Sequence, residues 1–152
     1  MATKASLLPG RVAARLARQV EVGLAQVDLS VPQYRILMFL DEGAAVASKL
    51  ADHLAVSRPS VTAVVDGLVA RGLVERRHDE QDRRRVGHVL TAEGGRVLEA
   101  ADREVDARLR EIAGYLPDEG EAAAAFDGLD RWRQSLDSYR AAKVAAREGG
   151  RR

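Results

Sequence analysis

The feature that most constrains the fold is a short helix with clear signals at both ends, followed at once by two short strands. The apolar residues of this helix recur at spacings of three and four, which places them on one face: Val61, Val64, Val65 and Leu68. Ser57 stands at the N-cap position, where its hydroxyl accepts a hydrogen bond from the first turn. Gly72 stands where a left-handed C-cap belongs. We therefore expect a helix over residues 57–71 with one buried and one exposed face.

The two strands are expected over residues 73–77 and 86–90, joined by the polar run from His78 to Arg85. Three consecutive arginines lie at the tip of this hairpin, behind an aspartate that can orient a guanidinium: Asp82, Arg83, Arg84 and Arg85. An arginine at such a tip can enter a DNA minor groove, whose negative potential is strongest where the groove is narrow. We therefore expect these residues to contact DNA.

Helical patterns account for most of the remaining chain. Few residues are aromatic (4%), and alanine and arginine abound, which favours helices over sheet. Ser30 is expected to cap one helix and Thr91 another, and the tail after about Val144 is expected to fray. The expected helices are 11–26, 30–41, 47–53, a long one from 91 to a break at 116–118, and a last one with an apolar stripe from 122 to 139.

This order of elements predicts a mainly α fold, a winged helix-turn-helix with a small β-hairpin wing, flanked by N- and C-terminal dimerisation helices. We expect a single domain over residues 1–152. The winged lobe would span about 30–90, and the helical dimerisation region about 10–27 and 91–145. The lobe is too small to cover the apolar faces of the long helices, which points to a twofold-related second copy. The alternative is that these helices fold back as a monomeric bundle.

The exposed face of helix 57–71 supplies further candidate DNA contacts near its N-terminus: Ser57, Arg58, Ser60 and Thr62. A helix N-terminus attracts phosphate, and hydroxyls and guanidinium groups hydrogen-bond to base edges. By itself this is a weak signal, because the same residues can serve as a cap and as solvated surface. Arg76 and Arg77 either flank the phosphates or solvate a strand.

Three segments of the chain resemble the MarR family of bacterial transcription regulators. They are LSVPQYRILMFL, LAVSRPSVTAVVDGLVARGLVERR and DRRRVGHVLTAEG. The resemblance covers residues 31–95, and the helical order of the whole chain fits it. The last segment is the most specific. The family pattern there is Asp, any residue, Arg, then a strand ending Leu-Thr, with Gly three residues after the Thr. It is matched by Asp82, Arg84, Leu90, Thr91 and Gly94.

The resemblance implies a homodimer, formed through the N- and C-terminal helices, that binds a near-palindromic operator in double-stranded DNA, usually as a repressor. Many members release DNA when a small, often phenolic or anionic, ligand enters a cleft between the dimer helices and the DNA-binding lobe. By analogy, Leu16, Tyr34 and Met38 are candidates for the wall of such a cleft. Apolar side chains at helical spacing usually belong to the core, which is the alternative role for these residues.

The chain also departs from the family. Ala63 stands where many relatives have arginine, which either weakens major-groove specificity or shifts it to Arg58. Absence of cysteine excludes disulfides and a cysteine redox switch. His53, His78 and His88 fall on separate elements, so we expect no metal site and no cofactor. No phosphate-binding glycine loop or persuasive Ser/His/Asp spacing occurs, so we expect no enzymatic activity.

Other functions stay open at this point. The formal net charge is only +1, so total charge does not indicate nucleic acid. A helical dimer acting as a protein-interaction module, with a degenerate DNA-binding lobe, is the main alternative, and a ligand carrier without DNA activity is another. No segment has the apolar length of a signal peptide or a membrane span, so we expect a cytoplasmic protein without membrane contact.

Overall fold

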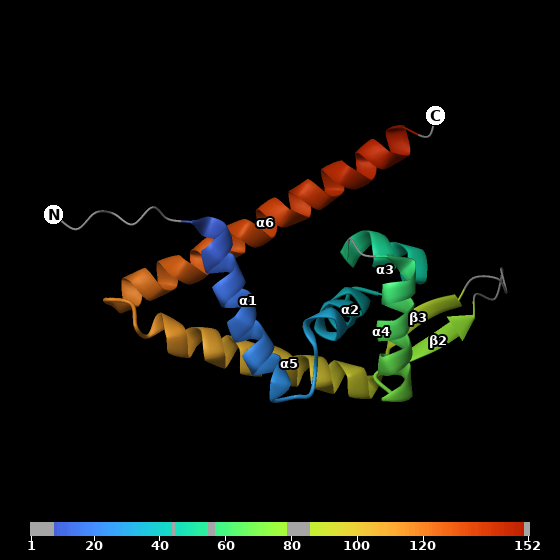
Figure 1. Ribbon diagram of the computed structural model, residues 1–152, viewed down its shortest axis with the longest axis horizontal. Helices are drawn as coiled ribbons and strands as arrows, with labels where there is room; N and C mark the ends of the chain where they lie inside the picture. Colours follow the sequence, from blue (N-terminus) through green and yellow to red (C-terminus); the bar gives the residue numbers. More distant parts are fainter. Residues whose placement is uncertain (1–7, 44, 55–56, 79–85, 151–152) are drawn as a thin grey trace. The chain divides into compact units, whose positions relative to one another are not determined.

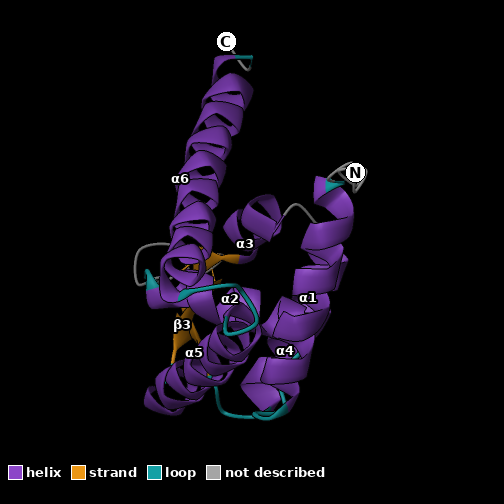
Figure 2. Cartoon of the chain, turned by 90° about the vertical axis from the view of Figure 1, so that its left-hand side faces the viewer, coloured by secondary structure: helices purple, strands orange, loops and turns teal. Residues whose placement is uncertain are grey.

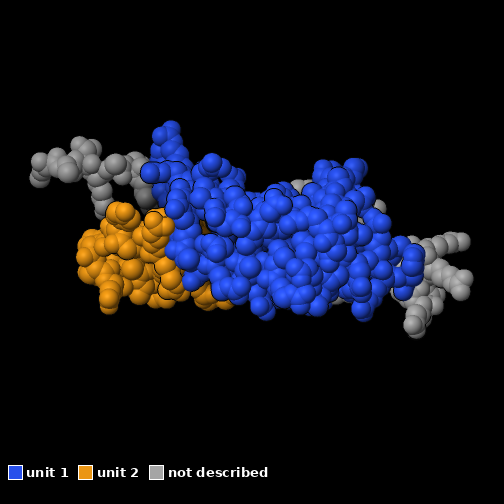
Figure 3. All heavy atoms as spheres, turned by 90° about the horizontal axis from the view of Figure 1, so that it is seen from below, with its two compact units in different colours: residues 1–109 blue, residues 110–152 orange. Residues whose placement is uncertain are grey.

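The computed structural model describes residues 8–43, 45–54, 57–78 and 86–150, and it confirms a mainly helical chain with a small antiparallel sheet (Figures 1 and 2). The chain divides into two compact units, Met1–Leu109 and Arg110–Arg152 (Figure 3). The elements are α1 (Pro9–Ala25), α2 (Val31–Asp41), β1 (Ala45–Val46), α3 (Ala47–Leu54), α4 (Arg58–Ala70), β2 (Val74–His78), β3 (Val86–Leu90), α5 (Ala92–Ala113) and α6 (Glu119–Gly149).

Polar caps set where two of these helices begin. Ser30 and Gln33 form a reciprocal capping box at the start of α2, because each side chain accepts from the other residue's backbone N–H, at 3.3 and 2.9 Å. Asp118 begins α6 by accepting from the Glu121 backbone N–H at 2.9 Å. The Ser30 cap confirms the expectation from sequence.

The core of the first unit lies among α1 to α5 and the base of the sheet. Ile36, Leu37 and Leu40 form the buried face of α2, as their spacing predicts. On α4, Val61, Val65 and Leu68 are buried and Val64 is partly buried, which confirms the apolar face expected there. The largest side chains with no more than 2% exposure are Leu24, Ile36, Leu37, Leu50, Val61, Val65, Leu68 and Val74. Together they anchor α4 by its inner face and leave its outer face to solvent.

The sheet has three strands in the order β1-β3-β2, all antiparallel. β3 lies in the centre, pairing Val74 with Leu90 and Arg76 with His88 on one side, and Ala45 with His88 on the other. β1 was not expected, because a two-residue strand is too short to show an alternating pattern. β2 begins one residue later than expected, because the Leu73 backbone N–H bonds to the Leu68 carbonyl at the end of α4.

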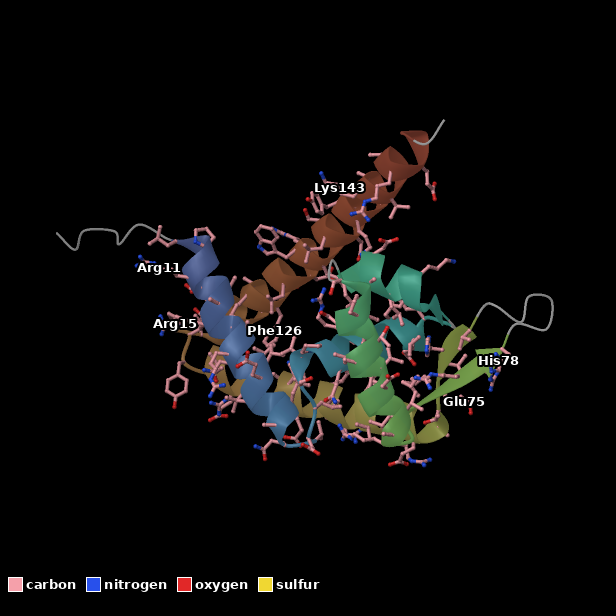
Figure 4. All side chains as sticks on the ribbon, turned by 45° about the vertical axis from the view of Figure 1, so that its right-hand side comes forward. Arg11, Arg15, Glu75, His78, Phe126 and Lys143 are labelled. Carbon is pink, nitrogen blue, oxygen red and sulfur yellow. The ribbon has the colours of Figure 1, made fainter. Side chains whose placement is uncertain are left out.

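The second unit consists of the end of α5 and the long helix α6. α6 continues to Gly149, which corrects the expectation of a frayed tail after Val144. Two cation–π contacts lie within this unit, Arg110 over Phe126 at 5.0 Å and Lys143 over Tyr139 at 5.3 Å. Phe126 and Lys143 are labelled in Figure 4. Five large apolar side chains of α6 are more than a third exposed: Leu129, Trp132, Leu136, Tyr139 and Val144.

Candidate nucleic-acid interface

The candidate interface is built on the N-terminal turn of α4. The Ser57 hydroxyl accepts from the Ser60 backbone N–H at 3.4 Å, which confirms its role as the cap. The two serine hydroxyls are also 2.8 Å apart. Ser57, Ser60 and Thr62 are all exposed, while Val61 between them is buried. The first turn of α4 therefore presents hydroxyl groups to solvent next to the positive end of the helix dipole.

The C-terminal end of α4 is equally well defined. Gly72 has a φ of +72°, in the left-handed region that favours glycine. The Leu73 N–H donates to the Leu68 carbonyl at 3.0 Å, and the Gly72 N–H donates to the Val69 carbonyl at 2.9 Å. These two bonds form a Schellman motif, which confirms the expected C-cap and turns the chain directly into β2.

Thr91 and Gly94, the last part of the family pattern, join the hairpin to the end of α4. The Thr91 hydroxyl donates to the Gly72 carbonyl at 2.7 Å and accepts from the Gly94 N–H at 2.9 Å. The Thr91 N–H donates to the Leu73 carbonyl at 3.1 Å. A Cβ at Gly94 would lie 2.1 Å from that same carbonyl oxygen, so only glycine fits without movement. This part of the pattern therefore fixes the base of the wing relative to α4.

Strand β2 carries two arginines on opposite faces, because side chains alternate along a strand. Arg76 shares its face with the buried Val74 and forms an ion pair with Asp66 on the outer face of α4. Arg77 lies on the other face, where it pairs with Glu75 of the same strand at 2.8 Å. Figure 4 shows Glu75 and His78 on this strand. Both described arginines of β2 thus have an acidic partner.

Five of the expected DNA contacts lie at the N-terminal end of α4 or on strand β2, which packs against α4: Ser57, Ser60, Thr62, Arg76 and Arg77. The side chain of Arg58 lies outside the described part of the structure. So does the whole tip of the wing, and with it Asp82, Arg83, Arg84 and Arg85.

Three polar contacts could not be predicted from the sequence, two of them at α4 and one between α2 and α3. Asp66 on the outer face of α4 pairs with Arg76, ten residues further along the chain. Arg71 donates at 2.7 Å to the carbonyl of Asp28, a non-glycine residue with a φ of +55°. Arg35 donates at 3.3 Å to the Leu54 carbonyl at the end of α3. Each pairs residues that are distant in sequence, so no local pattern announces it.

The three candidate ligand contacts lie on α1 and α2. Leu16 on α1 is half-buried, and Met38 on α2 is exposed. Tyr34 lies one turn before Met38 and donates to a carboxylate oxygen of Asp102 on α5 at 2.5 Å. Burial, followed by the hydrogen bond and the negative charge of Asp102, raises the pKa of Tyr34 well above its ordinary value. Tyr34 is therefore a neutral hydrogen-bond donor that links α2 to α5.

The described residues contain no group of His, Cys, Asp or Glu arranged to hold a metal ion. His88 is buried in β3 and His78 is exposed at the end of β2. Among the helices that the structure describes, none combines the length and apolarity that crossing a membrane requires.

Comparison with known proteins identifies relatives that share this architecture. Residues 27–85 match the model of the MarR family. The HTH-type transcriptional regulator FarR of Neisseria gonorrhoeae is 36% identical over 107 residues, which cover 68% of this chain and 73% of FarR. CouR from Rhodococcus jostii RHA1, solved bound to p-coumaroyl-CoA, superposes with a TM-score of 0.68 at 27% identity, covering 88% of this chain and 89% of CouR.

A mutant of MarR from E. coli, solved complexed with operator DNA, superposes with a TM-score of 0.65 at 25% identity, covering 82% of this chain and 89% of that one. These matches confirm the winged helix-turn-helix fold, and the relatives are named as regulators rather than as enzymes. The residues that carried the resemblance, from the capped helix α4 to Thr91 and Gly94, have the local structure that the pattern requires. The chain belongs to the MarR family of transcriptional regulators.

Proposed function

We propose that this protein is a sequence-specific DNA-binding regulator, a homodimeric repressor that a small molecule releases from its operator. The observation that carries the proposal is the two-sided character of α4. Its inner face is buried in the core, whereas its first turn presents the Ser57, Ser60 and Thr62 side chains to solvent. A helix anchored in this way can enter a major groove without losing any packing.

Each contact follows from the chemistry of its side chain. The hydroxyls of Ser57, Ser60 and Thr62 hydrogen-bond to phosphates or base edges, and the Thr62 methyl group suits thymine. Arg58 supplies a guanidinium at the same turn. It would contact the bases in place of the arginine that many relatives carry where this chain has Ala63. In the wing, Arg83, Arg84 and Arg85 reach the flanking minor groove, with Asp82 orienting one of them. Arg76 and Arg77 lie at the edge of the same surface.

A homodimer supplies the second half-site. The apolar side chains exposed along α6 form a stripe at helical spacing, as expected for a surface that a second copy covers: Leu129, Trp132, Leu136 and Tyr139. On α1, Val12 is also 44% exposed. In a twofold dimer the two α4 helices would lie about 34 Å apart, one turn of DNA, which requires a near-palindromic operator. We place the protein in the cytoplasm, where it would reach the chromosome.

Release by a small aromatic or anionic effector is supported by CouR, which was solved with p-coumaroyl-CoA. In this chain the candidate contacts are Leu16, Tyr34 and Met38. Tyr34 is the polar one, because its hydroxyl donates to Asp102 across α2 and α5. A ligand that takes over this hydrogen bond would change how α2 is held against α5 and thereby bias the position of the lobe.

Fluorescence anisotropy tests the proposal. The full-length protein is titrated against the DNA upstream of its own gene and against a scrambled duplex, each at two salt concentrations. Tighter binding to the native fragment, weakened by salt, is the expected result. Equal binding to both duplexes would contradict sequence specificity for that fragment. No binding to either duplex by the folded protein would contradict the proposal and favour a protein-interaction module.

A further inference from the structure

The ion pair between Asp66 and Arg76 joins the outer face of α4 to strand β2. Asp66 lies one helical turn beyond Thr62, so it belongs to the face that is proposed to enter the major groove. The side chains of Asp66 and Arg76 are 53% and 47% exposed. Pairs this exposed contribute little to stability, so folding by itself does not explain a carboxylate at this position.

A lone carboxylate on this face would be unfavourable, since it would approach the phosphates with the same sign of charge. The ion pair removes that repulsion, but it also engages the cation that would otherwise bind phosphate. On the opposite face of β2, Glu75 holds Arg77 in the same way, at 2.8 Å. The described part of β2 therefore adds no unpaired positive charge to the surface.

We infer that Asp66 is a positioning residue that keeps Arg76 out of contact with the DNA phosphates. This inference rests on the proposed function. Phosphate contacts supply affinity for any duplex and carry no direct sequence information. With Arg76 held by Asp66, the α4–β2 surface contacts DNA mainly through hydroxyl groups. The sequence-independent attraction to phosphates then comes from the arginines outside this pair. Asp66 thus limits binding to random DNA.

The slope of binding against salt tests this directly, because each phosphate that a protein neutralises contributes about −0.9 to the slope of log K against log salt. In Asp66→Asn the side chain keeps its size and loses its charge, so Arg76 becomes available to a phosphate. We expect the slope for a random duplex to steepen by about 0.9 per protomer. At about 0.1 M salt the affinity for random duplex should rise roughly five- to tenfold per protomer.

The double variant Asp66→Asn/Arg76→Gln removes both charges. If Arg76 makes no phosphate contact in the wild type, the double variant keeps the wild-type slope and an affinity for random duplex within about twofold. If Arg76 binds phosphate in the wild type, the slope becomes shallower by about 0.9 per protomer. That result would overturn the inference, as would an unchanged slope in Asp66→Asn.

Glu21→Gln is the matched control. Glu21 pairs with Arg18 at 2.9 Å on the exposed surface of α1, so the substitution also removes one negative charge and frees one arginine. α1 packs against α2, away from the hairpin (Figure 1). We expect its slope to match the wild type. An equal steepening in Glu21→Gln would show an effect of net charge alone and would also overturn the inference.

Failure of the inference differs from failure of the proposed function. If the wild type prefers the native fragment but Asp66→Asn has the wild-type salt slope, only the inference about Asp66 fails and the proposed function stands. Folded wild-type protein that binds no duplex removes both. Circular dichroism confirms that each variant is folded, and a role limited to folding would leave the salt slope unchanged.

Discussion

Replacing Gly94 by alanine tests the joint between the wing and α4. A Cβ on this residue would lie 2.1 Å from the Leu73 carbonyl oxygen and 2.8 Å from Cδ1 of Leu90, whereas ordinary van der Waals contact begins at 3.4 Å. Backbone is the nearest neighbour, so a side-chain rotation cannot relieve the clash. The start of α5 must instead move away from Leu73 by about 1 Å or more.

Such a shift has a definite cost. Overpacking of this kind typically destabilises a protein by about 1–3 kcal/mol. The shift also stretches the two bonds from Thr91 to Leu73 and Gly72, now 3.1 and 2.7 Å, each worth about 1 kcal/mol. Replacing a helical glycine by alanine returns about 0.5–1 kcal/mol. We expect Gly94→Ala to lower the free energy of unfolding by about 2–4 kcal/mol.

Gly95→Ala is the matched control, because no atom lies within 4 Å of a Cβ at that position in the same helical turn. The free energy of unfolding of Gly95→Ala should rise by about 0.5–1 kcal/mol from helix propensity alone. Urea unfolding followed by circular dichroism at one fixed chain concentration measures both, since a dimer's stability depends on concentration. If Gly94→Ala unfolds within about 0.5 kcal/mol of the wild type, the close approach does not constrain this joint and the reasoning is refuted.

Three further predictions concern DNA, acid–base behaviour and assembly. Arg84→Ala should weaken operator binding by about 1–3 kcal/mol in anisotropy titrations without dissociating the dimer, and unchanged affinity would remove this arginine from the mechanism. The pKa of Tyr34 is raised, by burial first and then by Asp102, so its stabilising contribution is complete below about pH 10 and declines above it. Urea unfolding between about pH 9 and 11 should therefore show the wild type losing stability relative to Tyr34→Phe. Leu136→Glu should shift the sedimentation coefficient towards that of a monomer, whereas an unchanged value would exclude α6 from the dimer interface.

Local rules made most of the fold predictable from sequence. Ser30, Ser57 and Thr91 act as N-caps, and Gly72 ends α4, because each effect depends on residues within one turn. The buried faces of α2 and α4 follow from spacing in the same way. A short helix such as α4, with a cap at each end and a single apolar face, has few other ways to pack.

The features that were missed depend on contacts between distant parts of the chain. β1 exists because β3 offers an open edge to residues 45 and 46, which have too short a pattern to be recognised. Asp28 adopts a positive φ at the turn after α1, where its carbonyl accepts from Arg71. α6 continues past Val144, because its charged residues favour a helix as readily as they favour a solvated tail.

The family pattern in the hairpin therefore combines two kinds of residue. Thr91 and Gly94 have a structural role inside the lobe. The Thr91 hydroxyl and the absence of a Cβ at Gly94 hold the start of α5 against the end of α4. Both residues therefore already have a role in joining the wing to α4, in which the Thr91 hydroxyl donates to the Gly72 carbonyl and accepts from the Gly94 N–H. Arg84 has no such internal requirement in the pattern, so recognition is expected to depend on it. Substitutions at Thr91 or Gly94 would therefore change DNA binding together with stability, whereas Arg84→Ala should change binding alone.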